Sequence, residues 1–366
     1  MRSPPVRLSP PAGSPLLFRG MLLLTGLVLA RPAAGQTRHE TDDGSPQFRL
    51  HGFSHVNFTS RWPSDGPAET GTALGNVDLF MTSRLADRVS FLAETNFEVT
   101  DNGETVVDLE RLLLKYSLTD WLKLSVGRGH TALGYWNEEV HHGVLLQPTV
   151  ERPRALQFED ENGILPVHFV GIEASGTVRV APDWNLRYTG NIANGRGATV
   201  EQVQGGRDVD QHKAVALKLS LQSSGAVSLR IGPSLYLDQI PLAVGPLRET
   251  ILGAHVVVKN TRYTIQAEGY HISHEPTQGG TTWEHWAGYA IAAVRFHQLS
   301  PYCGLDHESF DAGDPFFLGR DQDYTRVLGG LRYDLNVNNS LKLEYQHDNF
   351  PSETADALAL QIAFTF

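Results

Sequence analysis

The sequence predicts an all-β fold, a transmembrane antiparallel barrel of about sixteen strands, and three observations carry this prediction. The last ten residues alternate strictly between an apolar set and a small or polar set, and alternating segments and short turn-like connections recur along the chain. Side chains of a strand alternate between its two faces. A soluble protein rarely leaves a fully apolar strand face at an edge, whereas closure of a barrel in lipid removes the edge. The apolar set is Leu358, Leu360, Ile362, Phe364 and Phe366.

For the terminal strand alone, the alternative is the last strand of a secreted β-sandwich. The strand ends on an aromatic residue, as the signal strands of outer-membrane barrels do. We therefore interpret Phe364 and Phe366 as an assembly signal.

The first 35 residues have the pattern of an export signal peptide. A basic region with Arg2, Arg7 and Arg19 precedes an apolar core, Met21 to Ala30, and Ala33-Ala34-Gly35 offers small residues for cleavage. We divide the chain into a signal peptide (1–35), a short N-terminal lead-in (36–47) and a barrel (48–366). The predicted location is the outer membrane of a Gram-negative bacterium.

Composition excludes several other classes of protein. The chain carries a net charge of −11, and loss of the four arginines of the leader would make it more negative, which argues against nucleic acid as a partner. No stretch approaches the ~20 apolar residues of a spanning helix. The single cysteine, Cys303, has no partner within the chain for a disulfide.

Short connections with turn residues recur along the barrel region. Several are followed by an apolar-polar-apolar strand start, for example Trp121-Leu122-Lys123-Leu124. Seven such turns, with both termini at the same end, predict sixteen strands in eight hairpins. The turns are Ala86-Asp87, Thr119-Asp120, Ala181-Pro182-Asp183, Ser223-Ser224-Gly225, Lys259-Asn260-Thr261, Gln298-Leu299-Ser300 and Val337-Asn338-Asn339.

The spacing of the turns has one irregularity. Asp87 and Asp120 are 33 residues apart, but Asp120 and Asp183 are 63 apart. The surplus lies between Arg128 and His168, in the third long loop. In sixteen-stranded porins the third loop folds inward and narrows the pore, so we expect this one to occupy the lumen.

Several motifs resemble the family of phosphate-selective porins O and P. They are Leu109-Glu110-Arg111-Leu112-Leu113-Leu114-Lys115-Tyr116, Leu124-Ser125-Val126-Gly127-Arg128, Leu133-Gly134-Tyr135-Trp136, Glu151-Arg152-Pro153 and Val170-Gly171-Ile172-Glu173-Ala174-Ser175-Gly176. The resemblance implies a homotrimeric channel. That family's phosphate preference rests on many inward basic residues, whereas this chain is acidic, so the solute stays open.

Charged side chains of the loop and the strands are the candidate functional residues, because rings of charge filter ions without covalent chemistry. For the loop, the alternative is a solvated acidic surface loop. The predicted constriction residues are Glu138, Glu139, His141, His142, Glu151, Arg152, Arg154, Glu159, Asp160 and Glu161. The predicted pore-wall residues are Arg84, Arg111, Lys115, Lys123, Arg179, Arg187, Lys218, Arg230, Arg262, Arg332 and Lys342.

Most of these wall residues lie near short turns, whereas Glu94, Glu98, Glu268 and Asp348 lie farther along their strands. The pattern predicts a lumen with an acidic outer mouth and a basic inner vestibule. Glu344 and Asp334 break this pattern. A simple preference of basic residues for one barrel end is the alternative.

We predict no catalytic residue, cofactor or metal site. His141 and His142 lie near Glu138, but adjacent histidines point to opposite sides of an extended chain. No Gly-x-Ser-x-Gly motif marks a nucleophile, so a lipid-active enzyme has no support. We expect a passive diffusion channel for small hydrophilic solutes or ions; the alternatives are a substrate-specific anion channel and a structural or adhesive envelope barrel. The expected partners are outer-membrane lipid and lipopolysaccharide, the solutes and the outer-membrane assembly machinery.

Overall fold

The computed structural model describes residues 46–100, 103–140, 143–159 and 163–366. The chain divides into two units, 1–44 and 45–366, and the second is the barrel described below. The predicted signal peptide, nearly all of the lead-in, and the predicted constriction residues His141, His142, Asp160 and Glu161 lie outside the described residues. No helix among the described residues is long and apolar enough to span a membrane.

The described part of the barrel unit is almost entirely β-structure. Its strands are β1 (Gln47–Pro63), β2 (Glu69–Leu74), β3 (Val77–Ala86), β4 (Val89–Val99), β5 (Thr105–Thr119), β6 (Leu122–His130), β7 (His168–Ala181), β8 (Trp184–Ala193), β9 (Ala214–Ser223), β10 (Ser228–Ile240), β11 (Leu247–Lys259), β12 (Tyr263–Pro276), β13 (Trp283–Val294), β14 (Leu299–Phe310), β15 (Tyr324–Asn336), β16 (Asn339–Asn349) and β17 (Thr354–Thr365). Two short helices, α1 (Trp136–Glu139) and η1 (Arg154–Leu156), lie between β6 and β7.

β2 and β3 together make one strand of the barrel, because both pair with β1 in sequence. The strand is interrupted at Gly75. The ring of His55 lies where a side chain at Gly75 would stand, with its nearest atoms 2.2 Å from an ideal Cβ position. The described residues therefore contain the predicted sixteen barrel strands.

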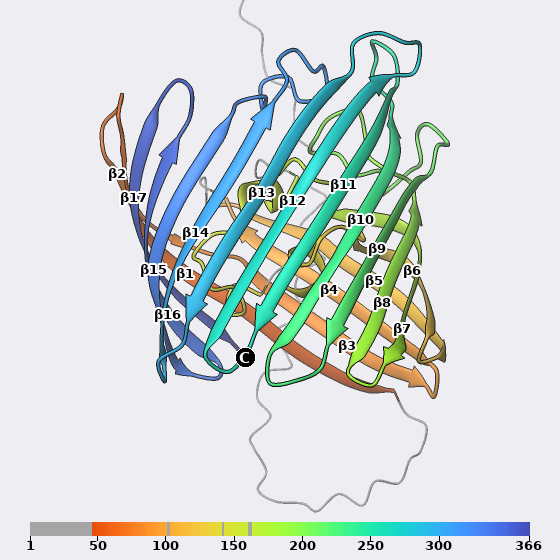
Figure 1. The fold of residues 1–366 in the computed structure, drawn as a ribbon, viewed down its shortest axis with the longest axis horizontal. Coiled ribbons are helices and arrows are strands. Elements are labelled where there is room, and N and C mark those ends of the chain that lie inside the picture. The colour runs from red at the N-terminus through yellow and green to blue at the C-terminus, as the bar shows by residue number, and fades with distance from the viewer. Residues whose placement is uncertain (1–45, 101–102, 141–142, 160–162) are drawn as a thin grey trace, which may run out of the picture. The chain divides into compact units, whose positions relative to one another are not determined.

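Antiparallel pairing runs around the whole barrel and closes it (Figure 1). With β2 and β3 counted as one strand, each strand pairs with its neighbour in the chain, and β1 also pairs with β17, from Phe53 opposite Thr365 to Pro63 opposite Ala355. Closure leaves no free sheet edge along this seam. The prediction of a closed, sixteen-stranded antiparallel barrel is confirmed.

Short turns gather at one barrel end, together with the start of β1 and the C-terminus (Figure 1). The prediction of a turn at Gln298-Leu299-Ser300 was slightly wrong, because the turn lies at His297-Gln298 and β14 begins at Leu299. His297 adopts a φ of +57°, which reverses the chain earlier. At the other end, the connections 131–167 (L3), 194–213 (L4) and 311–323 (L7) are long, and the remaining described connections are hairpins.

The two faces of the terminal strand follow the predicted alternation. Leu358, Leu360 and Ile362 are 41–44% exposed on the outside, while Ala359 and Ala363 face inward and are buried. Similar exposed apolar residues recur on the other strands; among them are Val126, Ile172, Ile192, Leu252, Leu305, Val327 and Leu343. The outer surface thus offers an apolar belt that lipid would cover.

The L3 loop lies inside the barrel, as predicted for the long third loop. Its backbone and side chains contact inward residues of strands on several sides, including β8, β12, β16 and β17. Loop residues such as Leu133, Trp136 and Leu165 are at most 1% exposed. A loop in bulk water would leave such side chains exposed, so L3 packs as part of the barrel interior.

Candidate solute pathway

One side of the lumen is filled by apolar packing of L3. Loop residues Leu133, Trp136 and Leu156 share a buried cluster with inward residues of β9–β13. The rings of Trp136 and Tyr289 meet edge to face, with centroids 5.5 Å apart. We call this side, L3 together with the wall strands β9–β13, the packed half.

Wall side chains satisfy the irregular backbone of L3. Glu268 on β12 accepts hydrogen bonds from the N–H groups of Tyr135 (2.6 Å) and Trp136 (2.8 Å). Lys342 on β16 donates to the carbonyls of Val144 (2.6 Å) and Thr149 (2.8 Å). Buried backbone groups outside regular structure need such partners, so these wall charges hold the loop in position.

Arg332 on β15 also binds backbone carbonyls of L3. Its guanidinium donates to the carbonyls of Leu145 (2.6 Å) and Gln147 (2.9 Å). Gln361 on β17 donates to the carbonyl of Val150 (3.1 Å), and Glu344 on β16 accepts from the Val150 N–H (3.0 Å). The Arg332, Lys342 and Glu344 side chains therefore bind loop backbone.

Acidic residues of L3 form ion pairs with basic residues of the wall. Glu138 lies 2.7 Å from Lys218, and Glu139 lies 3.0 Å from Arg187 and 2.7 Å from Arg230. Burial raises the pKa of Glu139, but the two guanidinium groups outweigh it and hold that pKa below the usual range. These loop acids and wall bases neutralise one another along β8–β10.

Glu151 and Arg154 pair with the wall at the other end of the loop. Glu151 contacts Arg326 at 2.5 Å, and Arg154 contacts Glu308 at 3.0 Å. The backbone N–H of Arg154 also donates to Asp306 at 2.6 Å. Each of the three wall partners lies on β14 or β15.

Glu159 holds the backbone where L3 ends and β7 begins. Its carboxylate accepts hydrogen bonds from the N–H groups of Val167 (2.8 Å) and His168 (3.0 Å), and it lies 3.2 Å from Nδ1 of His168. Burial raises the pKa of Glu159, but the His168 ring and the backbone donors outweigh burial and lower that pKa to about 2. Glu159 therefore acts as a fixed anion at neutral pH.

The other side of the barrel keeps open space along the wall. Three hollows lie along β1 and β3–β6, which we call the open half. The hollow at the turn end measures about 530 Å³, the one at mid-height about 170 Å³ and the one at the loop end about 370 Å³. Phe158 of L3 lines both the mid-height and the loop-end hollow.

The hollows at the two ends carry opposite charge. The turn-end hollow is lined by Arg49, Arg84, Arg88 and Lys115, with Asp87 as its acid. The loop-end hollow is lined mainly by acids, with Arg128 and His168 as its basic groups; these acids are Glu98, Asp108, Glu110, Glu159 and Glu201. Between them, Arg152 stacks its guanidinium on the Phe158 ring, 4.1 Å from the centroid, beside the mid-height hollow.

The remaining predicted wall residues have different surroundings. Arg111 pairs with Glu94 on the neighbouring strand, and Arg179 donates to the carbonyl of Pro182 at a turn. Lys123 lies opposite Ser175 on β7, and Arg262 lines a further hollow at the turn end of β11–β15. Of the assembly-signal pair, Phe366 exchanges two backbone hydrogen bonds with Gly52 (2.8 and 3.0 Å), and its ring covers that glycine.

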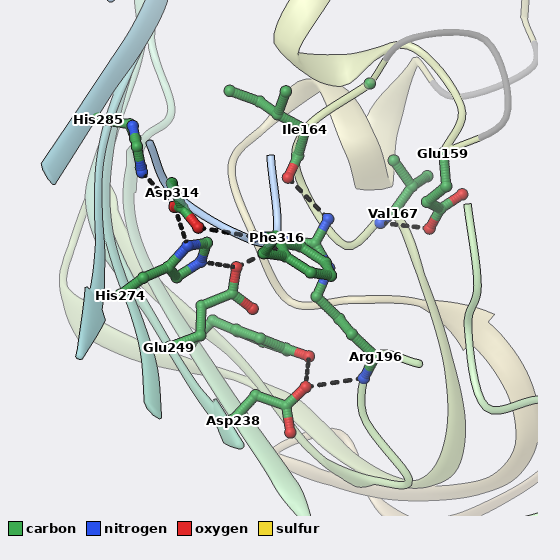
Figure 2. A network of polar contacts seen from close by, with 12 residues as sticks. Glu159, Ile164, Val167, Arg196, Asp238, Glu249, His274, His285, Asp314 and Phe316 are labelled. Atoms are coloured by element: carbon green, nitrogen blue, oxygen red, sulfur yellow. Dashed lines mark hydrogen bonds and ion pairs between the residues drawn. The ribbon is translucent and has the colours of Figure 1, made fainter. Parts of the chain in front are cut away.

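The prediction from sequence missed a buried polar cluster at the loop end of the packed half (Figure 2). His274, His285 and Asp314 present three potential metal-binding atoms within 4.8 Å of one another. The hairpin between β12 and β13 gave a usable signal, since its register places both histidines on the inward face. Asp314 comes from L7, and no local pattern connects it to that hairpin.

Comparison with known proteins rests on structure alone. No family model and no curated protein sequence matches this chain. Among solved structures, it is similar to the anion-selective porin from Comamonas acidovorans, with 10% identity, a TM-score of 0.63, and coverage of 88% of this chain and 100% of that one. OmpF of Salmonella typhi, solved in complex with daunomycin, matches with 10% identity, a TM-score of 0.60, and coverage of 88% and 98%.

The outer membrane channel DcaP of Acinetobacter baumannii is also similar, with 11% identity, a TM-score of 0.58, and coverage of 88% of this chain and 98% of that chain. At such low identity, these likenesses show the fold. The chain has the barrel architecture of outer-membrane porins and channels.

Proposed function

We propose that this protein is a passive diffusion channel for small hydrophilic solutes or ions in the outer membrane of a Gram-negative bacterium. The observation that carries the proposal is the set of three hollows along the open half. The apolar outer belt supports a membrane location. Selectivity then comes from width and fixed charge, and no catalytic step is assigned.

The partners that we propose follow from the apolar outer belt and the terminal strand. Lipid and lipopolysaccharide cover the apolar belt, and the outer-membrane assembly machinery recognises the strand that ends in Phe364 and Phe366. A homotrimer is proposed by analogy, because the similar structures include a trimer form of OmpT of Vibrio cholerae, which shares 11% identity with this chain.

A substrate-specific anion channel is the second candidate, and the turn-end hollow favours it. Four basic residues face one acid there, which concentrates anions. The motifs that resemble the phosphate-selective porins O and P, and the anion-selective porin among the similar structures, point in the same direction. The acidic loop-end hollow argues for the general channel, because an anion must pass it first.

Planar-bilayer recording distinguishes the three functions. A general channel gives stepwise conductance that rises in proportion to salt, with a reversal potential near zero in a potassium chloride gradient. A specific anion channel gives a reversal potential near that of chloride, and millimolar phosphate blocks its current. That block should weaken in an Arg84→Gln, Lys115→Gln double variant and persist in a Lys123→Gln control. A protein that inserts without any conductance is a structural barrel, and both channel proposals are then wrong.

A further inference from the structure

Three neighbouring strands and one loop build the buried polar cluster. Glu249 on β11 lies directly opposite His274 on β12, and His285 on β13 lies on the same inward face. L7 brings Asp314 onto these residues (Figure 2). All four side chains are fully buried.

One carboxylate oxygen of Asp314 binds both histidines. Asp314 Oδ2 lies 2.6 Å from Nδ1 of His274 and 2.7 Å from Nε2 of His285. The other nitrogen of His274, Nε2, lies 3.0 Å from Oε1 of Glu249. Ionised carboxylates only accept hydrogen bonds, so without a metal both nitrogens of His274 must carry hydrogens and its ring is positively charged.

His285 is in a different state. Its Nδ1 accepts a hydrogen bond from the backbone N–H of Asp311 at 3.3 Å, and its Nε2 donates to Asp314. The cluster thus holds two shared protons at the positions where two imidazole nitrogens and a carboxylate oxygen converge. This is the donor set that first-row divalent metals bind.

We propose that His274, His285 and Asp314 bind a divalent metal ion of the zinc class, which clips L7 to the barrel wall. The ion binds Nδ1 of His274, Nε2 of His285 and Oδ2 of Asp314; the hydrogen on Nδ1 of His274 is released to solvent, and the hydrogen on Nε2 of His285 moves to Nδ1 of the same ring. Donor atoms around tetrahedral zinc lie roughly 3.3 Å apart. Binding therefore needs a movement of about 0.6 Å of Asp314 away from the rings. It also brings the two imidazole nitrogens, which lie within 4.8 Å of each other, to the spacing of zinc ligands. The contact from Asp311 is given up, because Nδ1 of His285 then carries the hydrogen.

Residues around the three ligands fit this role. With the metal on Nδ1, Nε2 of His274 keeps its hydrogen and donates to Glu249, which is the carboxylate–histidine–metal arrangement common at metal sites. Arg196 holds the same Glu249 oxygen at 2.7 Å. The rings of Phe316 and Phe317 pack on His274, with centroids 5.5 and 5.0 Å away, and limit access of water.

Buried acids gather around the cluster. Glu249 meets the guanidinium of Arg196, Asp238 accepts the backbone N–H of the same arginine, and Asp314 lies on the two histidines. The second oxygen of Glu249 is buried and has no hydrogen-bond partner among the described residues. A divalent ion would add positive charge beside these acids, and buried charge is stable only when it is compensated.

The test is titration of Zn²⁺ into the full-length protein, purified in detergent and treated with chelator, by calorimetry. We expect one Zn²⁺ per chain, and proton release should make the observed enthalpy of binding vary with the ionisation enthalpy of the buffer. His285→Gln removes a metal ligand but keeps an amide that donates to Asp314, so L7 stays tethered. In this variant stoichiometric binding should be lost, while Glu249→Gln should weaken binding by about 10- to 100-fold.

His347→Gln is the matched control, because His347 pairs with exposed Asp356 far from L7 in sequence. It should bind Zn²⁺ as the wild type does, and heat-modifiable mobility in gels confirms that each variant is folded. Absence of stoichiometric Zn²⁺ binding in the folded wild type overturns the proposal, and so does equal affinity in His285→Gln. Either outcome leaves the proposed channel function untouched, since conductance is measured separately.

Discussion

The packed half and the open half of the barrel are built from strands with the same alternation of inward and outward side chains, but their inward side chains differ in size. In the packed half, inward positions hold large side chains such as Tyr236, Tyr270 and Tyr289, which are buried against L3 and L7. In the open half, inward positions hold Thr82 and Ser90 beside basic residues, and the space in front of them is empty. The size of the inward side chains therefore matches the side of the lumen that the loop fills.

Inward charges also differ between the two halves. Glu268 in the packed half and Lys342 beside it bind loop backbone, and Lys218 binds a loop acid. Arg84 and Lys115 in the open half line a hollow. The number of inward charges alone therefore says little about the field that an ion meets, because many of them are already neutralised by the loop.

The largest expected effect comes from removing the loop that creates the difference. Deletion of residues 144–161 removes the groups that Lys342, Arg332 and Arg326 hold, and it empties the middle of the lumen. Single-channel conductance in planar bilayers should rise severalfold, while the barrel still inserts. An unchanged conductance would show that L3 does not limit the current.

A second large effect is expected at the seam beside the open half. Deletion of Phe366 removes the two backbone hydrogen bonds to Gly52 and the ring that covers this glycine. The amount of heat-modifiable protein in outer membranes should fall strongly, measured by gel mobility with and without boiling. Gly52→Val, which forces the same ring aside, should reduce it in the same direction. Normal levels of the truncated protein would contradict a role in assembly.

The loss of unfolding free energy on removing a large side chain should differ between the two halves. Trp136→Ala leaves a cavity in the packed half and should lower the free energy of unfolding by about 3–5 kcal/mol, measured by denaturant titration. Phe80→Ala in the open half should cost clearly less, because Phe80 is only half-buried beside Arg111. Equal losses would mean that both halves are packed alike.

The smallest expected effect concerns the two ends of the open half. An acidic hollow in series with a basic one makes conduction rectify, because each voltage polarity fills a different end with counter-ions. Currents at equal and opposite voltages should differ in dilute salt. The asymmetry should fade at 1 M salt, where screening acts within about 3 Å. A symmetric curve in dilute salt would rule out the polarised lumen but not the channel.

Sequence reasoning predicted the features that depend on local pattern. The period of two along each strand gave the inward and outward faces, and turn residues gave the number of strands, because these signals lie within a few neighbouring residues. The excess length between Arg128 and His168 predicted the inward loop. The turn predicted at Gln298-Leu299-Ser300 missed His297, a non-glycine residue with a positive φ, which is an uncommon conformation.

The side of the lumen that L3 occupies was beyond prediction from sequence. Tyr135 and Glu268, which fix that side, are 133 residues apart, and no pattern in either segment specifies the other. The pairing of Glu139 with Arg187 and Arg230 depends on the same placement. For the same reason the His274–His285–Asp314 cluster was missed, since one ligand comes from a distant loop.

Cysteine labelling during bilayer recording tests most directly whether the open half carries the current. In a Cys303→Ser background, Ser90→Cys places a thiol in the turn-end hollow, and Ser234→Cys places one on β10 in the packed half. Addition of a negatively charged methanethiosulfonate should lower the conductance of Ser90→Cys stepwise and leave that of Ser234→Cys unchanged. Full labelling of Ser90→Cys, verified by mass spectrometry, without any change in conductance would contradict a solute pathway along the open half.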